Sequence, residues 1–267
     1  MGQGVDALLN QLMEAIGAAR PVVLATVIDT SRSVPRHAGS KMLVFGDGST
    51  LGTIGGGEME SRVIEQALAA LTDGKTRSLE FSLLDPLKGD PGVCGGEVRL
   101  YLEPYMPAPV VYVVGCGHIG KAIVELAHWL GYRVVATDDR PEMVSEDALP
   151  LADVRISGAI AEVLERVPVT EDTHVVVVSR NMAVDVEVLP QLLRTPARSI
   201  GLMGSRRRWE TTRKELLARG CTEAEVGSLR VPIGLELGAE TPKEIAISVL
   251  AELVMLRRAG TGEPMSS

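Results

Sequence analysis

Apolar runs and amphipathic stretches alternate through the C-terminal part of this chain. Four runs rich in Val, Ile and Leu predict strands buried on both faces, at 109–115, 132–139, 173–179 and 199–204. Apolar residues at helical spacing predict helices at 118–130 and near 158–166, 184–193, 205–219 and 241–257. This alternation predicts an α/β fold with a Rossmann-like, doubly wound parallel sheet.

The N-terminal part carries a different pattern. A helix is predicted near 5–19 and a strand at 21–28. The sequence Gly-Asp-Gly-Ser at 46–49 separates two short apolar runs, as a turn between antiparallel strands does. Helical spacing returns at 58–71, and 97–104 alternates like a half-buried strand. We therefore expect a smaller α+β domain before the parallel sheet.

Three prolines separate these two parts of the chain. Pro104, Pro107 and Pro109 cannot continue a helix or a central strand, so residues 102–110 are predicted to be a linker. The linker divides the chain into domains at 1–104 and 105–267, and both have an ordinary domain size.

Composition excludes several classes of protein. The net charge of −8 argues against nonspecific nucleic-acid binding. No stretch reaches the roughly 18 uninterrupted apolar residues of a membrane span. The N-terminus predicts an amphipathic helix and a strand rather than a signal peptide. The three cysteines (Cys94, Cys116 and Cys221) form no C-x-x-C pair, which favours a reducing compartment, so we expect a cytoplasmic protein.

The motif "GCGHIG" follows the first C-terminal strand and opens a helix. Gly115 permits a tight turn, Gly117 lets a diphosphate approach the backbone, and Gly120 lets the helix pack closely on the sheet. Asp138 ends the next strand, where it can accept a hydrogen bond from a ribose hydroxyl. His118 would lie near any phosphate, although a polar residue at a helix start is the simpler interpretation. The motif predicts a site for NAD, another nucleotide or a pterin nucleotide; a scaffold with a vestigial site is the alternative.

A second glycine motif, "GTIGGGEMES", lies between a predicted strand and a helix. Consecutive N–H groups at Gly55, Gly56 and Gly57 would form a nest for a phosphate or another oxyanion. Basic residues upstream, Arg36 among them, would add charge-assisted hydrogen bonds to the same anion. A tight turn beside solvated basic residues is an equally good interpretation.

Two further features are candidates for chemistry. Arg206 opens a run of three arginines in the first turn of a helix, where the dipole disfavours cations. This placement hints at an anionic partner, but a solvated helix face has equal weight. Cys94 lies in "PGVCGGEV", where glycines leave its thiol accessible to a substrate, a metal or another protein. A small residue at a turn is the alternative for Cys94, and Cys116 is expected to be a buried filler.

Together and in this order, these motifs resemble the XdhC/CoxI family, the accessory proteins of xanthine dehydrogenase and related molybdenum hydroxylases. The resemblance runs from about Leu12 to Leu256 and rests on six segments: "ATVIDTSRSVPRHAGSKMLV", "GTIGGGEMES", "VCGGEVRLYLEP", "VVGCGHIGKAI", "IGLMGSRRRWE" and "PIGLELGAETPKEIAISVLAEL". It implies a chaperone that binds the molybdenum cofactor (molybdopterin). Such a protein holds the cofactor while a cysteine desulfurase helps to install the sulfido ligand, and then delivers it to a xanthine dehydrogenase-type hydroxylase.

The resemblance also implies roles for particular residues. Cys94 matches the Cys-Gly-Gly of the family motif and becomes a candidate for contact with molybdenum, for which thiolate is a soft ligand. Glu60 matches the acidic residue after the triple glycine. One position departs from the family: many relatives read Thr-His-Asp-x-x-x-Asp after the fourth strand, and Arg180 replaces the histidine here while Asp185 matches. An arginine there suits a phosphate. The alternative is that the substitution marks a subfamily that serves another hydroxylase, such as one of the carbon-monoxide dehydrogenase type.

The alternative function is that of an NAD-dependent oxidoreductase. Such an enzyme needs a domain that brings an acid–base residue to the nicotinamide, and the chain has only four histidines. Two of them, His128 and His174, are expected to be structural. We therefore expect an accessory protein without turnover of its own. A redox-sensing regulator is a third possibility, but no DNA-binding element is recognisable. A homodimer is expected, because the small domain alone covers little surface.

Overall fold

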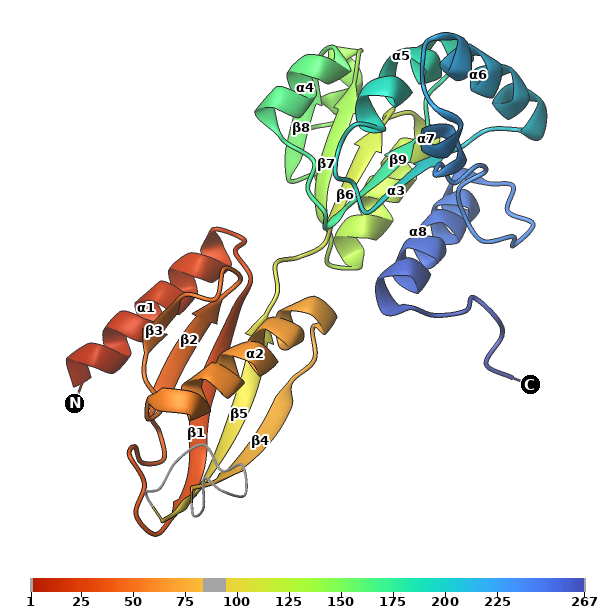
Figure 1. Ribbon diagram of the computed structural model, residues 1–267. Coiled ribbons are helices and arrows are strands. Elements are labelled where there is room, and N and C mark those ends of the chain that lie inside the picture. The colour runs from red at the N-terminus through yellow and green to blue at the C-terminus, as the bar shows by residue number, and fades with distance from the viewer. Residues whose placement is uncertain (1, 84–94, 267) are drawn as a thin grey trace. The chain divides into compact units, whose positions relative to one another are not determined.

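The computed structural model describes residues 2–83 and 95–266. The chain forms two compact units, Met1–Pro107 and Ala108–Ser267. Figure 1 shows a mixed sheet-and-helix unit at each end of the connecting segment. Among the described residues, no helix combines the length and the apolar character that crossing a bilayer requires.

The N-terminal unit is built on a five-stranded antiparallel sheet with the order β3-β2-β1-β5-β4. The elements follow the chain as α1 (Gly2–Gly17), β1 (Val22–Ser31), β2 (Lys41–Phe45), β3 (Thr50–Gly52), α2 (Gly57–Asp73), β4 (Arg77–Ser82) and β5 (Glu97–Tyr105). Side chains alternate between the two faces of the sheet, so each face can bury one helix. Val23, Ala25 and the Met59 side of α2 form one core, and Leu8, Leu12 and α1 pack with the opposite face.

β5 continues through Pro104 to Tyr105, which corrects the linker expected at 102–110. Pro104 pairs with Val23 of β1, whereas pairing with β4 ends at Leu102 and Arg77. Pro104 therefore has a strand on one side only, an edge-like position where a sheet tolerates proline. The two compact units divide between Pro107 and Ala108.

The C-terminal unit contains a five-stranded parallel sheet with the order β10-β9-β6-β7-β8. Its elements are β6 (Val110–Val114), α3 (His118–Trp129), β7 (Arg133–Asp138), the 3-10 turn η2 (Pro141–Val144), β8 (Val154–Ser157), α4 (Ile160–Arg166), β9 (Thr173–Val177), α5 (Met182–Leu192), β10 (Ser199–Leu202), α6 (Arg206–Ala218), α7 (Glu223–Gly227) and α8 (Pro242–Arg258). The chain adds β7 and β8 on one side of β6 and then returns to add β9 and β10 on the other. The predicted doubly wound parallel sheet and the smaller N-terminal α+β domain are thus confirmed.

Both faces of this sheet are covered by helices (Figure 1). Val111, Val113 and Val176 face α3 and α8, whereas Tyr112, Val114 and neighbouring strand residues face α4, α5 and α6. Burial on both faces explains why the strands are continuous apolar runs. The sequence pattern does not predict β4, β8 or α7. These short elements mix polar and apolar residues and so lack the continuous apolar run that marks the other strands of the parallel sheet.

Candidate functional site

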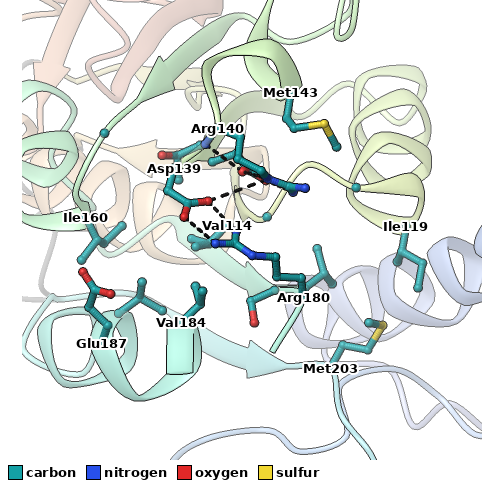
Figure 2. Close-up of a pocket in the computed structure, with 18 of the residues that line it drawn as sticks. Val114, Ile119, Asp139, Arg140, Met143, Ile160, Arg180, Val184, Glu187 and Met203 are labelled. Atoms are coloured by element: carbon teal, nitrogen blue, oxygen red, sulfur yellow. Dashed lines mark hydrogen bonds and ion pairs between the residues drawn. The ribbon is translucent and has the colours of Figure 1, made fainter. Parts of the chain in front are cut away.

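A cavity of about 410 Å³ opens at the carboxyl ends of the parallel strands. Its wall combines the loop after β6, the start of α3, and the segments that follow β7, β8, β9 and β10; Figure 2 shows its side chains. The strand order reverses between β6 and β9 at this edge, which is where open α/β sheets bind ligands. Its volume lies in the range of small-molecule pockets. The cavity is therefore the candidate binding site of the C-terminal unit.

The glycines of "GCGHIG" shape the wall between β6 and α3. Gly115 has a φ of +101°, and a Cβ there would lie 2.7 Å from the carbonyl oxygen of Val178. A Cβ on Gly120 would lie 2.0 Å from the carbonyl oxygen of Gly115, so only glycine lets α3 pack this closely. Gly117 has open space at its Cβ position and begins α3 without a side-chain cap. Together with His118, which lines the cavity, these residues have the shape of a dinucleotide-binding turn.

Asp138 ends β7 beside this turn, but protein donors already occupy its carboxylate. Its Oδ1 accepts from the backbone N–H and Nε of Arg140, at 3.1 and 2.8 Å. Its Oδ2 accepts from Nη2 of Arg140 and from the N–H of Cys116, at 2.9 and 2.8 Å. A carboxylate has about four acceptor positions, and this side chain is 2% exposed. A ribose hydroxyl, the expected partner, would therefore have to displace Arg140.

Asp139 forms a second aspartate–arginine pair within the cavity. Nη1 and Nη2 of Arg180 donate to the two carboxylate oxygens of Asp139, at 2.6 and 2.7 Å. Figure 2 shows Asp139 between the guanidinium groups of Arg140 and Arg180. The hydrogen bonds from Arg180 lower the pKa of Asp139 to about 2, against a smaller opposing effect of burial. The arginine that departs from the family motif thus points into the candidate site.

Of the three consecutive arginines at the start of α6, one forms a buried ion pair and two are exposed. Arg208 donates from Nε and Nη2 to Oδ2 of Asp185, at 2.8 and 2.5 Å, and from Nη2 to the Ser179 hydroxyl at 2.7 Å. Ser179 in turn donates to Oδ1 of Asp185 at 2.5 Å. Arg206 and Arg207 are exposed, and neither lines the cavity. Arg208 therefore connects α6 to the start of α5. This buried ion pair explains why one of the three arginines lies in the first turn of α6.

In the N-terminal unit, the triple-glycine turn encloses a carboxylate from the chain itself. Oε1 of Glu60 accepts from the N–H groups of Ile54, Gly55 and Gly56 at 3.0, 3.3 and 2.9 Å, and from the Thr53 hydroxyl at 2.5 Å. Burial raises the pKa of Glu60, but these hydrogen bonds outweigh burial and lower it. Two of the amides expected to bind an external anion are therefore already satisfied.

The triple-glycine turn, the basic loop before it and the start of β5 lie close together. A Cβ on Gly55 would lie 3.1 Å from Cγ of Pro35, so the basic loop crosses the glycine turn. A Cβ on Gly96 would lie 2.3 Å from the carbonyl oxygen of Ser33, so the start of β5 contacts the same loop. Arg36 is exposed on this loop. Cys94 lies outside the described residues, but its neighbour Gly95 donates to the carbonyl of Leu83 at 2.8 Å.

Replacing Glu60 with alanine is expected to destabilise the N-terminal unit by about 1–3 kcal/mol, because partly buried donors lose their acceptor. Hydrogen–deuterium exchange of residues 53–60 should speed up, and the thermal transition measured by circular dichroism should fall. Glu58→Ala is the matched control, since Glu58 pairs with Arg62 at the exposed helix surface. Equal effects of the two variants would show that the carboxylate does not hold the glycine turn.

The two described cysteines, Cys116 and Cys221, have no cluster of candidate metal ligands around them within the described residues. Cys116 is buried, and burial, followed by the nearby charge of Asp138, raises the pKa of its thiol to about 12. Burial also raises the pKa of Cys221. Within residues 2–83 and 95–266, no group of three or more His, Cys, Asp or Glu side chains can hold a metal ion. Cys116 is a buried filler of the glycine turn, as expected.

Asp139 and Arg140, which place two opposite charges at the end of β7, were not among the residues predicted from the sequence. A signal was present, because both directly follow Asp138 at the end of a predicted strand and so lie at the carboxyl edge of the sheet. The ion pair of Asp139 could not be predicted from the sequence, since its partner Arg180 lies 41 residues further along the chain.

Two family models match this chain. The model described as XdhC Rossmann domain matches residues 111–253, and the model described as XdhC and CoxI family matches residues 15–82. A solved structure titled as a xanthine dehydrogenase from Bacillus halodurans is 24% identical with a TM-score of 0.52, covering 96% of this chain and 97% of that chain. It has the same fold.

Three curated relatives are similar in sequence. The uncharacterized protein YqeB of Escherichia coli is 34% identical over 91% of this chain and 44% of its own length. A probable xanthine dehydrogenase subunit of Bacillus subtilis is 29% identical, over 60% of this chain and 46% of its own length. The molybdenum cofactor insertion chaperone PaoD of E. coli is 23% identical, over 94% of this chain and 88% of its own length. The match thus spans less than half of the first two relatives. Because the Rossmann-domain model alone matches more than half of the chain, the chain belongs to the XdhC and CoxI family.

Proposed function

We propose that this protein is a molybdenum-cofactor chaperone that binds molybdopterin, holds it during sulfuration and delivers it to a hydroxylase of the xanthine dehydrogenase type. The observation that carries the proposal is the match to the insertion chaperone PaoD, which covers both units of this chain. A chaperone of this kind has to bind and release a phosphorylated heterocycle, and the cavity offers suitable contacts.

The cavity of the C-terminal unit fits such a cargo in size and in chemistry. Val114, Ile119 and Met143 present apolar surface to a ring, and Arg140 and Arg180 bring positive charge to the same space. A few polar groups on a mostly apolar wall are typical of sites that hold small heterocycles. Arginine pairs well with phosphate oxygens, because its donors form a planar fork.

The N-terminal unit supplies the candidate for metal contact. Cys94 matches the family motif by resemblance, and its neighbours Gly95 and Gly96 contact Leu83 and the loop that carries Arg36. A thiolate is a soft ligand that suits a sulfur-rich molybdenum centre. We propose Cys94 as the residue of this chain that binds molybdenum in the cargo.

Cys94→Ala is expected to lower the molybdenum retained per protein chain by about tenfold, because loss of a direct ligand costs at least as much as loss of its supporting contacts. The chain would be co-expressed with an active molybdenum-cofactor pathway, purified, and assayed for molybdenum and for released pterin phosphate. Cys221→Ala is the control, since that cysteine lies in the C-terminal unit. Unchanged retention with a native circular dichroism spectrum would exclude Cys94 as the ligand.

The same preparation decides between the chaperone and the NAD-dependent oxidoreductase. PaoD, purified in parallel, is the positive control for pterin retention. The chaperone proposal would be overturned if this chain retained no pterin while PaoD did, and if it bound NAD(H) tightly in a titration. The occupied carboxylate of Asp138 argues against ribose recognition and so favours the chaperone. A cysteine desulfurase, the client hydroxylase and a second copy of this chain are the proposed partners. Co-purification and light scattering test them.

A further inference from the structure

The pair formed by Asp139 and Arg180 crosses the turn on which a diphosphate would bind. Asp139 follows β7 and Arg180 follows β9, and β6 lies between these two strands in the sheet. The pair therefore joins the two neighbours of β6 directly beyond its carboxyl end. The loop that leaves β6 at this point carries Gly115 and Gly117, and all four residues line the same cavity.

Part of each guanidinium group is available to a ligand. Arg180 uses Nη1 and Nη2 toward Asp139, and Arg140 uses Nε and Nη2 toward Asp138. Within the described part of the chain, Nε of Arg180 and Nη1 of Arg140 have no hydrogen-bond partner. Arg180 is 43% exposed and its partner 49%, so this pair can rearrange at little cost. The Asp138–Arg140 pair is more firmly held, because Asp138 is buried.

We infer that the cavity binds a diphosphate-bearing nucleotide, that Arg180 is its anion-binding residue, and that Asp139 weakens this binding by competing for the same guanidinium group. The diphosphate would lie against the Gly117 end of α3, where no side chain caps the helix. Asp138 would not contribute to affinity through the ribose. The inference does not rest on the proposed cargo, since a free nucleotide and the nucleotide end of a pterin dinucleotide share this chemistry.

The two residues of the pair should have opposite effects on affinity. Isothermal titration calorimetry of the purified full chain would compare ADP, GDP and CDP with their monophosphates. The diphosphate of the preferred base should bind about tenfold more tightly than its monophosphate, as one added charge-assisted contact implies. Arg180→Gln should weaken diphosphate binding by about tenfold, and Asp139→Asn should strengthen it by about threefold to tenfold.

Glu223→Gln is the matched control for Asp139→Asn. It removes one carboxylate that pairs with an arginine, Arg213, in the same unit but outside the cavity. Fluorescence of Trp129 and Trp209, the two tryptophans of the chain, would verify that each variant is folded. The inference is overturned if no diphosphate binds more tightly than its monophosphate, or if Asp139→Asn weakens binding as much as Arg180→Gln does.

A second measurement separates the two sources of the nucleotide. If the ligand is the nucleotide end of the cargo, Arg180→Gln should also reduce the pterin that co-purifies with the chain. If the ligand is a separate nucleotide, pterin retention should stay unchanged while diphosphate affinity falls. If the unaltered chain retained pterin but bound no diphosphate more tightly than its monophosphate, this inference would be rejected and the chaperone proposal would stay intact.

Discussion

Arg208→Ala should lower the free energy of unfolding of the C-terminal unit by about 3–5 kcal/mol, because it leaves a buried carboxylate without its counter-charge. Asp185 is 0% exposed, and both of its oxygens are engaged by Arg208 and Ser179. Without Arg208, the Ser179 hydroxyl would be the only side chain in the described part of the chain that donates a hydrogen bond to this carboxylate. Urea denaturation followed by tryptophan fluorescence measures the loss, since both tryptophans belong to this unit.

The control for this variant is Arg213→Ala. Arg213 lies on α6, as Arg208 does, and forms an exposed pair with Glu223 of α7. That change should cost at most about 1 kcal/mol. Combining Arg208→Met with Asp185→Leu removes both charges, so the double variant should be less destabilised than the sum of the single ones. Equal costs for Arg208→Ala and Arg213→Ala would show that the buried pair does not stabilise the fold.

Acidification should destabilise the C-terminal unit through His174. This side chain is 1% exposed at the start of β9, and Nδ1 lies 2.7 Å from the Ser199 hydroxyl, while Nε2 has no partner among the described residues. Burial, and then the charges of Arg198, Arg257 and Arg230, lower its pKa from 6.5 to about 4. The ring is therefore neutral in the folded chain at pH values where an unfolded chain binds a proton.

The sign of this effect follows from proton binding. Above pH 6.5 both states carry a neutral ring, so His174 contributes no pH dependence. Between pH 6.5 and 4 only the unfolded state takes up the proton, and the free energy of unfolding should fall by about 3 kcal/mol. Near and below pH 4 the folded state is protonated as well, and the loss levels off.

Urea denaturation at several pH values from 7 to 4 tests this prediction. His174→Gln should flatten the slope relative to the unaltered chain, because the carboxylates, which titrate in both chains, cancel in the difference. His128→Gln, which removes an exposed histidine of α3, is the matched control. If His174→Gln and the unaltered chain lost stability in parallel, His174 would not be the group responsible.

Much of the architecture was predictable, because it depends on local pattern. Buried parallel strands are continuous apolar runs and helices repeat every 3.6 residues, so the Rossmann-like sheet and the smaller α+β domain were both recognised. The shape of the turn at Gly115–Gly120 was predictable for the same reason, because the steric constraints that require glycine there are local. The order of the motifs was enough to identify the family.

The pairing of charges was not predictable from local pattern. Asp138 was expected to face a ribose, but its acceptors are filled by Arg140 and Cys116. The amides of Gly55 and Gly56 were expected to bind an external anion, but Glu60 folds back onto them from the first turn of α2. In both cases a partner within the chain satisfies the group, and no count of donors along the sequence shows which partner comes within reach.

By itself, the sequence determined most of the strands and helices, the glycine turns and the family of this protein, because each depends on residues close together in the chain. The tertiary structure alone decided which aspartate meets which arginine. Strand order places β6 between β7 and β9, which brings Arg180 to Asp139 across 41 residues. It also places β10 beside β9, which brings Arg208 to Asp185 across 23 residues. A hydrogen bond needs its partners within about 3 Å, and only the folded sheet sets that distance.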